Sequence, residues 1–145
     1  MATGKLSIVG TPIGNREDVT LRALRVLKEA DQIASEDTRH TGQLLAHYGI
    51  RKPLVSYHEF NEAQRTTELL AKIQNGLTVS LVSDAGMPTV SDPGSRLIRA
   101  ARDAELPVEV IPGPSAVTTA LAGSWLGGGP FHFHGFLPHK SGQRR

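Results

Sequence analysis

One short polar segment of the sequence carries the residue types that general acid–base chemistry needs. Glu36 and Asp37 supply two neighbouring carboxylates, and a hydroxyl, a guanidinium and an imidazole follow on Thr38, Arg39 and His40. A carboxylate can accept the proton of a hydroxyl group, so Glu36 and Asp37 are the candidate general bases. A solvated loop or a helix N-terminus also favours such acids, and this structural interpretation stands beside the functional one.

A second segment places a carboxylate among small residues. Asp84 directly follows the apolar run Thr78–Ser83 and precedes Ala85–Pro88. A carboxylate accepts hydrogen bonds from hydroxyl or ammonium groups, and small neighbours let a ligand approach the backbone amides. Aspartate also caps turns in proteins without any ligand. Both interpretations of Asp84 stay open on residue types alone.

Two further loops contain glycine and proline where a strand is expected to end. Gly10–Asn15 lacks the lysine and Ser/Thr of a P-loop, and its spacing is not G-x-G-x-x-G. The loop therefore argues against a nucleoside triphosphatase and against a standard dinucleotide-binding domain. Pro112–Ser115 precedes an expected helix, where Ser115 either caps the helix or faces a ligand with the first helix amides.

Short apolar runs that alternate with helical periodicity predict the elements that position these loops. The expected strands are Lys5–Val9, Gln32–Ser35, Leu54–His58, Thr78–Ser83 and Val108–Ile111. The expected helices are one capped by Thr20, then Thr41–Tyr48, Asn61–Gln74, Ser95–Ala104 and Ala116–Ala122. This alternation predicts an α/β fold with a mostly parallel five-stranded sheet flanked by helices. The polar loops would then open at one edge of the sheet and share one site.

The composition indicates a globular, cytoplasmic protein. The chain has 145 residues, 39% hydrophobic content, a formal net charge of +2 and no cysteine. The absence of cysteine excludes disulfides, thiolate metal ligands and cysteine nucleophiles. No apolar run approaches the roughly 20 residues that span a bilayer, so no membrane association is expected. The basic excess is compatible with a nucleic-acid partner but is too small to indicate one.

The character of the chain changes after residue 123. We expect one α/β domain over residues 1–123 and the start of an interdomain linker over residues 124–145, with a strand at Phe131–Leu137 inside it. His132, His134 and His139 lack an acidic residue at a convincing spacing, so no metal site is expected. The basic end comprises Lys140, Arg144 and Arg145.

Several of these segments, in their order along the chain, resemble one family. The sequence is similar to the RsmI-type branch of the tetrapyrrole methylase superfamily, which methylates a cytidine ribose 2′-hydroxyl of small-subunit (16S) ribosomal RNA. The matching segments are Gly10–Asn15, Glu36–Thr41, Ser80–Pro88, Ser91–Gly94, Ile111–Ala116 and Gly135–Pro138. The resemblance implies a tetrapyrrole methylase-like N-terminal domain that holds S-adenosylmethionine in a cleft shared with a second domain.

The resemblance also assigns roles to individual residues. The implied cofactor contacts fall on Ile13, Asp84, Ala85, Gly86, Met87, Ser115 and Ala116. The implied contacts with the RNA substrate fall on Asn15, Thr38, Arg39 and Lys140. The implied partner is 16S ribosomal RNA or the small ribosomal subunit, and without its second domain the chain is expected to be inactive.

Three alternatives remain beside the RNA methyltransferase. A small-molecule methyltransferase of the same superfamily, acting on a tetrapyrrole, would favour a first loop of the G-x-G-P-G-D-P type, whereas this chain has Thr11–Asn15. A non-catalytic module could use the same fold to bind a nucleotide or S-adenosylmethionine. The domain could also form a homodimer that covers an exposed apolar cleft.

Overall fold

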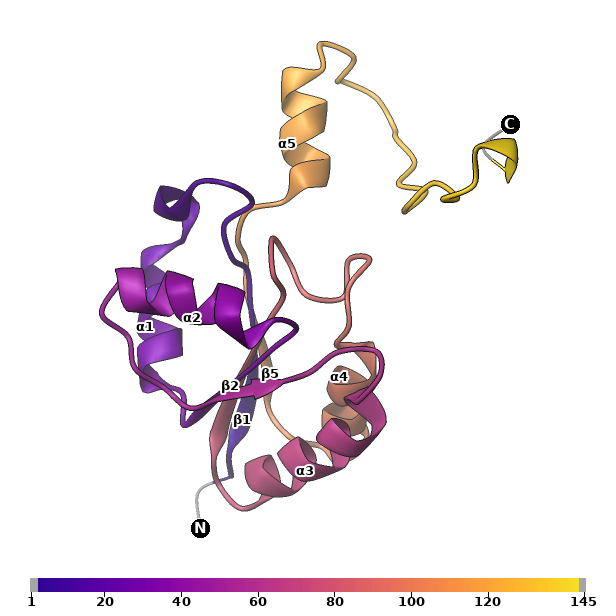
Figure 1. Ribbon diagram of the computed structural model, residues 1–145. Coiled ribbons are helices and arrows are strands. Elements are labelled where there is room, and N and C mark those ends of the chain that lie inside the picture. Colours follow the sequence, from indigo (N-terminus) through magenta and orange to yellow (C-terminus); the bar gives the residue numbers. More distant parts are fainter. Residues whose placement is uncertain (1–2, 144–145) are drawn as a thin grey trace. The chain divides into compact units, whose positions relative to one another are not determined.

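Five parallel strands form one sheet in the order β3-β2-β4-β1-β5. The computed structural model describes residues 3–143 of the chain (Figure 1). The strands are β1 Lys5–Val9, β2 Gln32–Ser35, β3 Leu54–Ser56, β4 Thr78–Val82 and β5 Val108–Ile111. Every pairing between them is parallel, which confirms the predicted sheet. The only differences are that β3 and β4 end slightly earlier than predicted.

Helices connect the strands and flank the sheet. They are α1 Leu21–Glu29, α2 Thr38–His47, α3 Glu62–Gln74 and α4 Ser95–Asp103, with a 3-10 turn at Arg16–Asp18. After the last strand, the chain forms α5 Ala116–Gly123 and a 3-10 turn at Ser141–Gln143. The Thr20 cap of α1 is confirmed, because its side chain accepts a hydrogen bond from the Ala23 backbone N–H at 2.9 Å. The other predicted helix boundaries differ from the observed ones by at most one residue, except at the start of α2.

Helix α2 begins three residues before its predicted start at Thr41. Asp37 is its N-cap, and the Asp37 carboxylate accepts a hydrogen bond from the Arg39 backbone N–H at 2.9 Å. Of the two structural interpretations of this segment, the helix N-terminus is therefore confirmed, and a loop that continues through Thr38 and His40 was wrong. A carboxylate that satisfies a free amide at the helix start stabilises helical backbone in a segment with no apolar periodicity.

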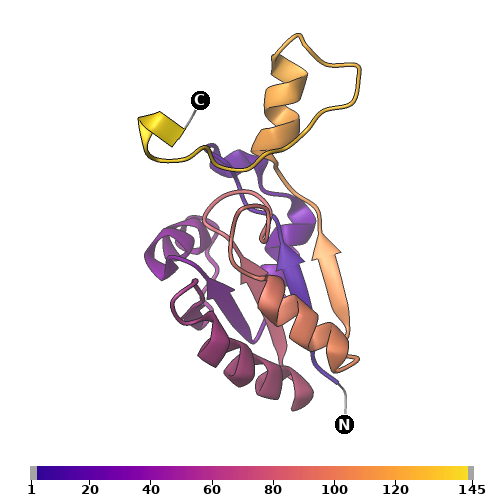
Figure 2. The same ribbon diagram turned by 90° about the vertical axis from the view of Figure 1, so that its right-hand side faces the viewer.

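Apolar side chains fill both faces of the sheet. On one face, α1 and α2 cover a buried cluster that includes Val9, Leu27 and Ile33. On the other face, α3 and α4 cover a cluster that includes Leu81 and Leu97 (Figure 1). With helices on both faces, the strand ends are the part of the sheet left free to carry a site. Figure 2 shows the strands side by side, with their connecting loops gathered beyond the arrowheads.

The chain divides into two compact units, the first ending at Ser115 and the second beginning at Ala116. The predicted strand at Phe131–Leu137 is wrong, because the backbone there has no regular structure. An isolated strand leaves its backbone groups without a ladder partner. Among the described residues, no helix is long and apolar enough to cross a membrane. Arg144 and Arg145 lie outside the described residues.

Candidate active site

The loops that follow β1 and β4 are joined at the carboxyl edge of the sheet. Thr11 and Gly86 form an antiparallel bridge in which each backbone N–H donates to the other residue's carbonyl at 3.0 Å. The buried Thr11 hydroxyl also donates to the Ser83 carbonyl at 3.2 Å. These bonds hold both loops in one arrangement, so a ligand at this edge would meet an ordered backbone.

The loop that follows β5 packs against the same two loops. A Cβ added to Gly10 would lie only 2.7 Å from the Cα of Gly113, so the two backbones approach closely enough to require glycine. A Cβ at Gly86 would lie 3.5 Å from the Pro114 carbonyl oxygen. With a spacing of about 3.8 Å between consecutive Cα atoms, these contacts keep Asp84 and Ser115 within about 20 Å of each other. The expected common edge for the two residues is therefore present.

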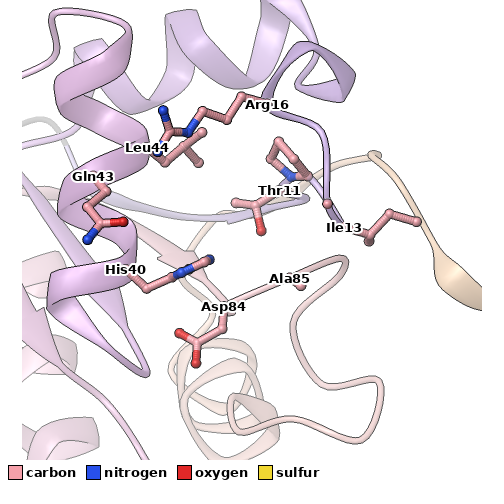
Figure 3. Close-up of a pocket in the computed structure, with 10 residues that line it drawn as sticks. Thr11, Ile13, Arg16, His40, Gln43, Leu44, Asp84 and Ala85 are labelled. Carbon is pink, nitrogen blue, oxygen red and sulfur yellow. The ribbon is translucent and has the colours of Figure 1, made fainter.

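A cavity of about 240 Å³ opens between the β1 loop, the β4 loop and α2 (Figure 3). Three of the expected cofactor residues, Ile13, Asp84 and Ala85, line it. The other lining residues are Thr11, Pro12, Gly14, Arg16, His40, Gln43 and Leu44. Arg16, Gln43 and Leu44 were not predicted from the sequence. Gln43 and Leu44 reach the cavity because α2 packs beside the strand ends, and Arg16 reaches it from the 3-10 turn that follows the β1 loop.

Asp84 links this cavity to the start of α2. Its carboxylate accepts a hydrogen bond from the Asp37 backbone N–H at 3.0 Å. This bond satisfies one of the amides that a helix leaves free at its N-terminus. Asp84 therefore has a structural role, but not the predicted one of capping the turn that follows it, because the amide belongs to a residue 47 positions earlier in the chain. A carboxylate has about four acceptor positions, so this bond does not preclude a ligand contact.

Asp37 and Arg39 form an ion pair at the surface. The Arg39 Nε lies 3.3 Å from the Asp37 carboxylate, and the arginine side chain is 89% exposed. Hydrogen bonds from the side chain and the backbone N–H of Arg39 hold the pKa of Asp37 below its usual range. A carboxylate with a lowered pKa is a weaker proton acceptor, so Asp37 is poorly suited to act as a general base.

Glu36 lies in a different environment from its neighbour. It lines a second cavity of about 500 Å³ whose walls include Glu59, Glu62, Asp92 and Arg96. We call this cavity the acidic groove. Burial raises the pKa of Glu36, and the nearby carboxylates of Asp84, Asp92 and Glu59 raise it further. Asp92, which sequence reasoning did not select, also has a raised pKa because of burial and Asp84.

The remaining expected site residues do not line the first cavity. The Met87 sulfur would lie 2.7 Å from a Cβ on Gly10, so the Met87 side chain packs on that glycine rather than lining the first cavity. Asn15 accepts a hydrogen bond from the Glu17 backbone N–H at 3.0 Å and caps the 3-10 turn. Thr38 is the first residue of α2. Ser115 directly precedes α5, and Ala116 and Lys140 belong to the second unit.

The histidines of the second unit form a pair. The rings of His132 and His134 lie 5.6 Å apart. Within residues 3–143, no group of three or more histidine or acidic side chains is arranged to hold a metal ion.

Relatives of this chain are ribosomal RNA methyltransferases. It is 51% identical, over 98% of its length, to the ribosomal RNA small subunit methyltransferase I of Thermotoga maritima, of which it covers 64%. It is 52% identical, over 98% of its length, to the protein of the same name from Escherichia coli O157:H7, of which it covers 50%. The chain thus spans between half and two thirds of the length of these relatives.

Solved structures and a family model agree on the fold. The uroporphyrin-III-C-methyltransferase of Thermus thermophilus is 34% identical and superposes with a TM-score of 0.66, over 86% of this chain and 53% of that protein. Residues 5–128 match the family model of the tetrapyrrole (corrin/porphyrin) methylases. More than half of the chain lies within that match, and the chain belongs to the tetrapyrrole methylase family.

Proposed function

We propose that the protein methylates the 2′-hydroxyl of a cytidine in small-subunit ribosomal RNA, and that this chain supplies the part that holds the methyl donor and the reacting ribose. The observation that carries the proposal is the convergence of Ile13, Asp84 and Ala85 on one cavity beside the acidic groove that contains Glu36. The relatives that are about half identical to this chain act, by name, on ribosomal RNA. The proposed location is the cytoplasm, where ribosomal RNA is accessible.

Methylases of this family use S-adenosylmethionine as the methyl donor, which supplies an electrophilic methyl group on a sulfonium sulfur. The residues of the first cavity fit the methionine part of that molecule. Ile13 and Leu44 offer apolar contact, and Asp84 offers a carboxylate for the ammonium group. The cavity volume of about 240 Å³ is smaller than the roughly 300–1,000 Å³ of complete ligand sites, so the first cavity accommodates only part of the molecule.

Glu36 is the better general base of the two candidates. Its pKa is raised by burial and neighbouring carboxylates, whereas the pKa of Asp37 is lowered by Arg39. A base with a higher pKa accepts a hydroxyl proton more readily. We therefore assign proton removal from the ribose hydroxyl to Glu36. Asp37 instead holds the start of α2 and orients Arg39.

The ordered loops would contribute alignment rather than acid–base chemistry. Transfer of a methyl group to an oxygen requires the oxygen to lie in line with the bond that breaks, and holding the reactants in place removes most of the entropic cost. The bridge between Thr11 and Gly86 and the close approach of Gly10 to Gly113 fix the backbone around the cavity. These features suit a site in which positioning carries much of the rate enhancement.

The direct test is a methyl-transfer assay in which two alternative substrates are offered separately. The full-length protein is incubated with S-adenosylmethionine carrying a tritiated methyl group, and with either small ribosomal subunits or a uroporphyrinogen. We expect the label on ribosomal RNA, at one ribose. The phosphodiester bond on the 3′ side of that ribose should become resistant to alkaline hydrolysis, because its 2′-hydroxyl is blocked. Label on the tetrapyrrole alone would instead support the small-molecule methyltransferase. Binding of the donor without transfer to either substrate would support the non-catalytic module.

A further inference from the structure

Helix α4 carries an arginine at every third position. These residues are Arg96, Arg99 and Arg102, and all three are exposed, whereas Leu97 and Ala101 of the same helix are buried. Residues three apart are neighbours along one side of a helix, separated by about 4.5 Å of rise. The three guanidinium groups therefore form a continuous positive surface on the outer side of α4, which we call the arginine ridge.

The charge of the arginine ridge is largely uncompensated. Among the described residues, Arg99 and Arg102 form no ion pair, and Arg96 reaches Glu62 only at 3.9 Å. By contrast, the Arg65 guanidinium of α3 lies 2.6 Å from Glu68. Helix α4 contains three arginines and one acid, Asp103, so its net charge is +2, equal to that of the whole chain. Such a local excess of guanidinium groups attracts a polyanion.

The arginine ridge adjoins the acidic groove. Arg99 and Arg102 line a depression of about 360 Å³ together with Thr89, Ser95, Ile98 and the single acid Asp103. Thr89 and Ser95 also line the acidic groove, where Arg96 and Glu36 are found. The two surfaces are thus continuous, and a strand lying along α4 would lead directly to Glu36.

The acidic groove and the arginine ridge carry opposite charges, so they attract different parts of an RNA strand. Phosphates are repelled by the carboxylates of Glu36, Glu59, Glu62 and Asp92 and are attracted by the ridge. A ribose hydroxyl or the exocyclic amine of a cytosine carries no negative charge and can donate to a carboxylate. An RNA strand therefore matches this surface when its phosphates contact α4 and one nucleoside enters the groove.

We propose that Arg99 and Arg102, with Arg96 at the edge of the groove, bind phosphates of the RNA strand next to the target nucleotide. A planar guanidinium donates two parallel hydrogen bonds to a phosphate, which suits these residues to the task. The inference rests on the proposed function, since the RNA substrate itself comes from that proposal. It adds the surface that holds the substrate and the direction in which the strand enters the site.

The test compares two variants that each lose two arginines. R99Q/R102Q removes the ridge, and R22Q/R25Q removes two exposed arginines from α1, on the other face of the sheet. Affinity for a small-subunit ribosomal RNA transcript is measured over a range of salt concentrations. R99Q/R102Q should bind on the order of tenfold more weakly at ~0.1 M salt and reduce the slope of log affinity against log salt by about 1.5. The α1 variant should retain the wild-type slope.

Two further measurements keep the inference separate from the proposed function. S-adenosylmethionine affinity and melting temperature should not change in R99Q/R102Q. R99K/R102K keeps the two charges without the planar guanidinium, so it should restore the salt slope and only part of the RNA affinity. If the wild-type protein binds and methylates the RNA but R99Q/R102Q keeps its salt slope, the inference is wrong while the proposed function stands. If the wild-type protein neither binds nor methylates the RNA, the proposed function fails first. If R99Q/R102Q instead dissociates a homodimer, the ridge is a protein interface and the inference is overturned.

Discussion

The carboxylate of Asp84, at the end of β4, accepts a hydrogen bond from the backbone N–H of Asp37 at the start of α2. The bond is 3.0 Å long and joins residues 47 positions apart in the sequence. It connects the loop that lines the first cavity with the helix that provides His40 and Gln43 to the same cavity. Asp84 thus couples the stability of α2 to the geometry of the first cavity.

This coupling makes two substitutions of Asp84 differ in effect. D84A leaves the partly buried amide of Asp37 without its acceptor, and we expect it to lower the free energy of unfolding by about 1–2 kcal/mol. D84N keeps an oxygen acceptor and removes the charge, so it should cost less stability. Both variants should weaken S-adenosylmethionine binding, measured by calorimetry, since both lose the carboxylate. Unchanged affinity in D84N would leave Asp84 with a purely structural role.

Substituting Glu36 should raise stability while abolishing transfer. Burial and neighbouring carboxylates raise the pKa of Glu36 in the folded state, so its ionisation disfavours folding. The contribution of Glu36 to stability is therefore most favourable below its unfolded-state pKa of about 4.3, and it is lost as the pH rises through its folded-state pKa. E36Q should melt like the wild type near pH ~3.5 and at a higher temperature near neutral pH.

The control for E36Q is E17Q in the 3-10 turn, where the side chain is exposed. This variant should melt like the wild type at both pH values. A lower melting temperature of E36Q at neutral pH would show that the folded protein stabilises the ionised form of Glu36, which would contradict the raised pKa. Full methyl transfer by E36Q would exclude Glu36 as the general base.

The sheet could be predicted from the sequence because its strands are short apolar runs with sharp ends. β1, β2 and β5 have the predicted bounds, and Thr20 caps α1 as expected. The start of α2 could not be found in this way. Its first residues are polar and resemble a loop, although an aspartate followed by a threonine is a common helix start.

The meeting of the strand-end loops could be predicted from chain order, whereas the side chains that α2 adds to the first cavity could not. Ile13, Asp84 and Ala85 lie in the loops that follow β1 and β4, and the carboxyl-edge rule brings these loops together. Gln43 and Leu44 reach the cavity only because α2 lies beside the strand ends. The contrast between Glu36 and Asp37 has the same origin, because burial and an arginine neighbour, and not residue type, set their pKa values apart.

The close approach of Gly10 to Gly113 predicts a sharp intolerance of side chains. A Cβ at Gly10 would lie 2.7 Å from the Cα of Gly113, which is backbone and cannot rotate away. G10A should therefore displace the β1 and β5 loops, lower the melting temperature and weaken S-adenosylmethionine binding. G42A in α2 is the matched control, because its Cβ would lie 3.6 Å from a Leu54 methyl group. Alanine favours the helix, so G42A should gain up to about 1 kcal/mol of stability.

Arg39 and Asp37 allow paired predictions of opposite sign. The Arg39 side chain is 89% exposed, so its ion pair with Asp37 contributes little to stability and R39A should leave the melting temperature nearly unchanged. If Arg39 contacts an RNA phosphate, R39A should weaken RNA binding and reduce its salt slope by about 0.7, the value for one phosphate of a single strand. S-adenosylmethionine affinity should stay the same.

D37N provides the reverse change on the same contact. Asparagine caps helices as well as aspartate does, so D37N should preserve α2 while releasing Arg39 from its carboxylate partner. The released guanidinium and the lost negative charge should both strengthen RNA binding at low salt, and R39A should remove most of that gain in the double variant. Equal RNA affinities for wild type, R39A and D37N over the full range of salt would show that Arg39 serves only as the surface partner of Asp37.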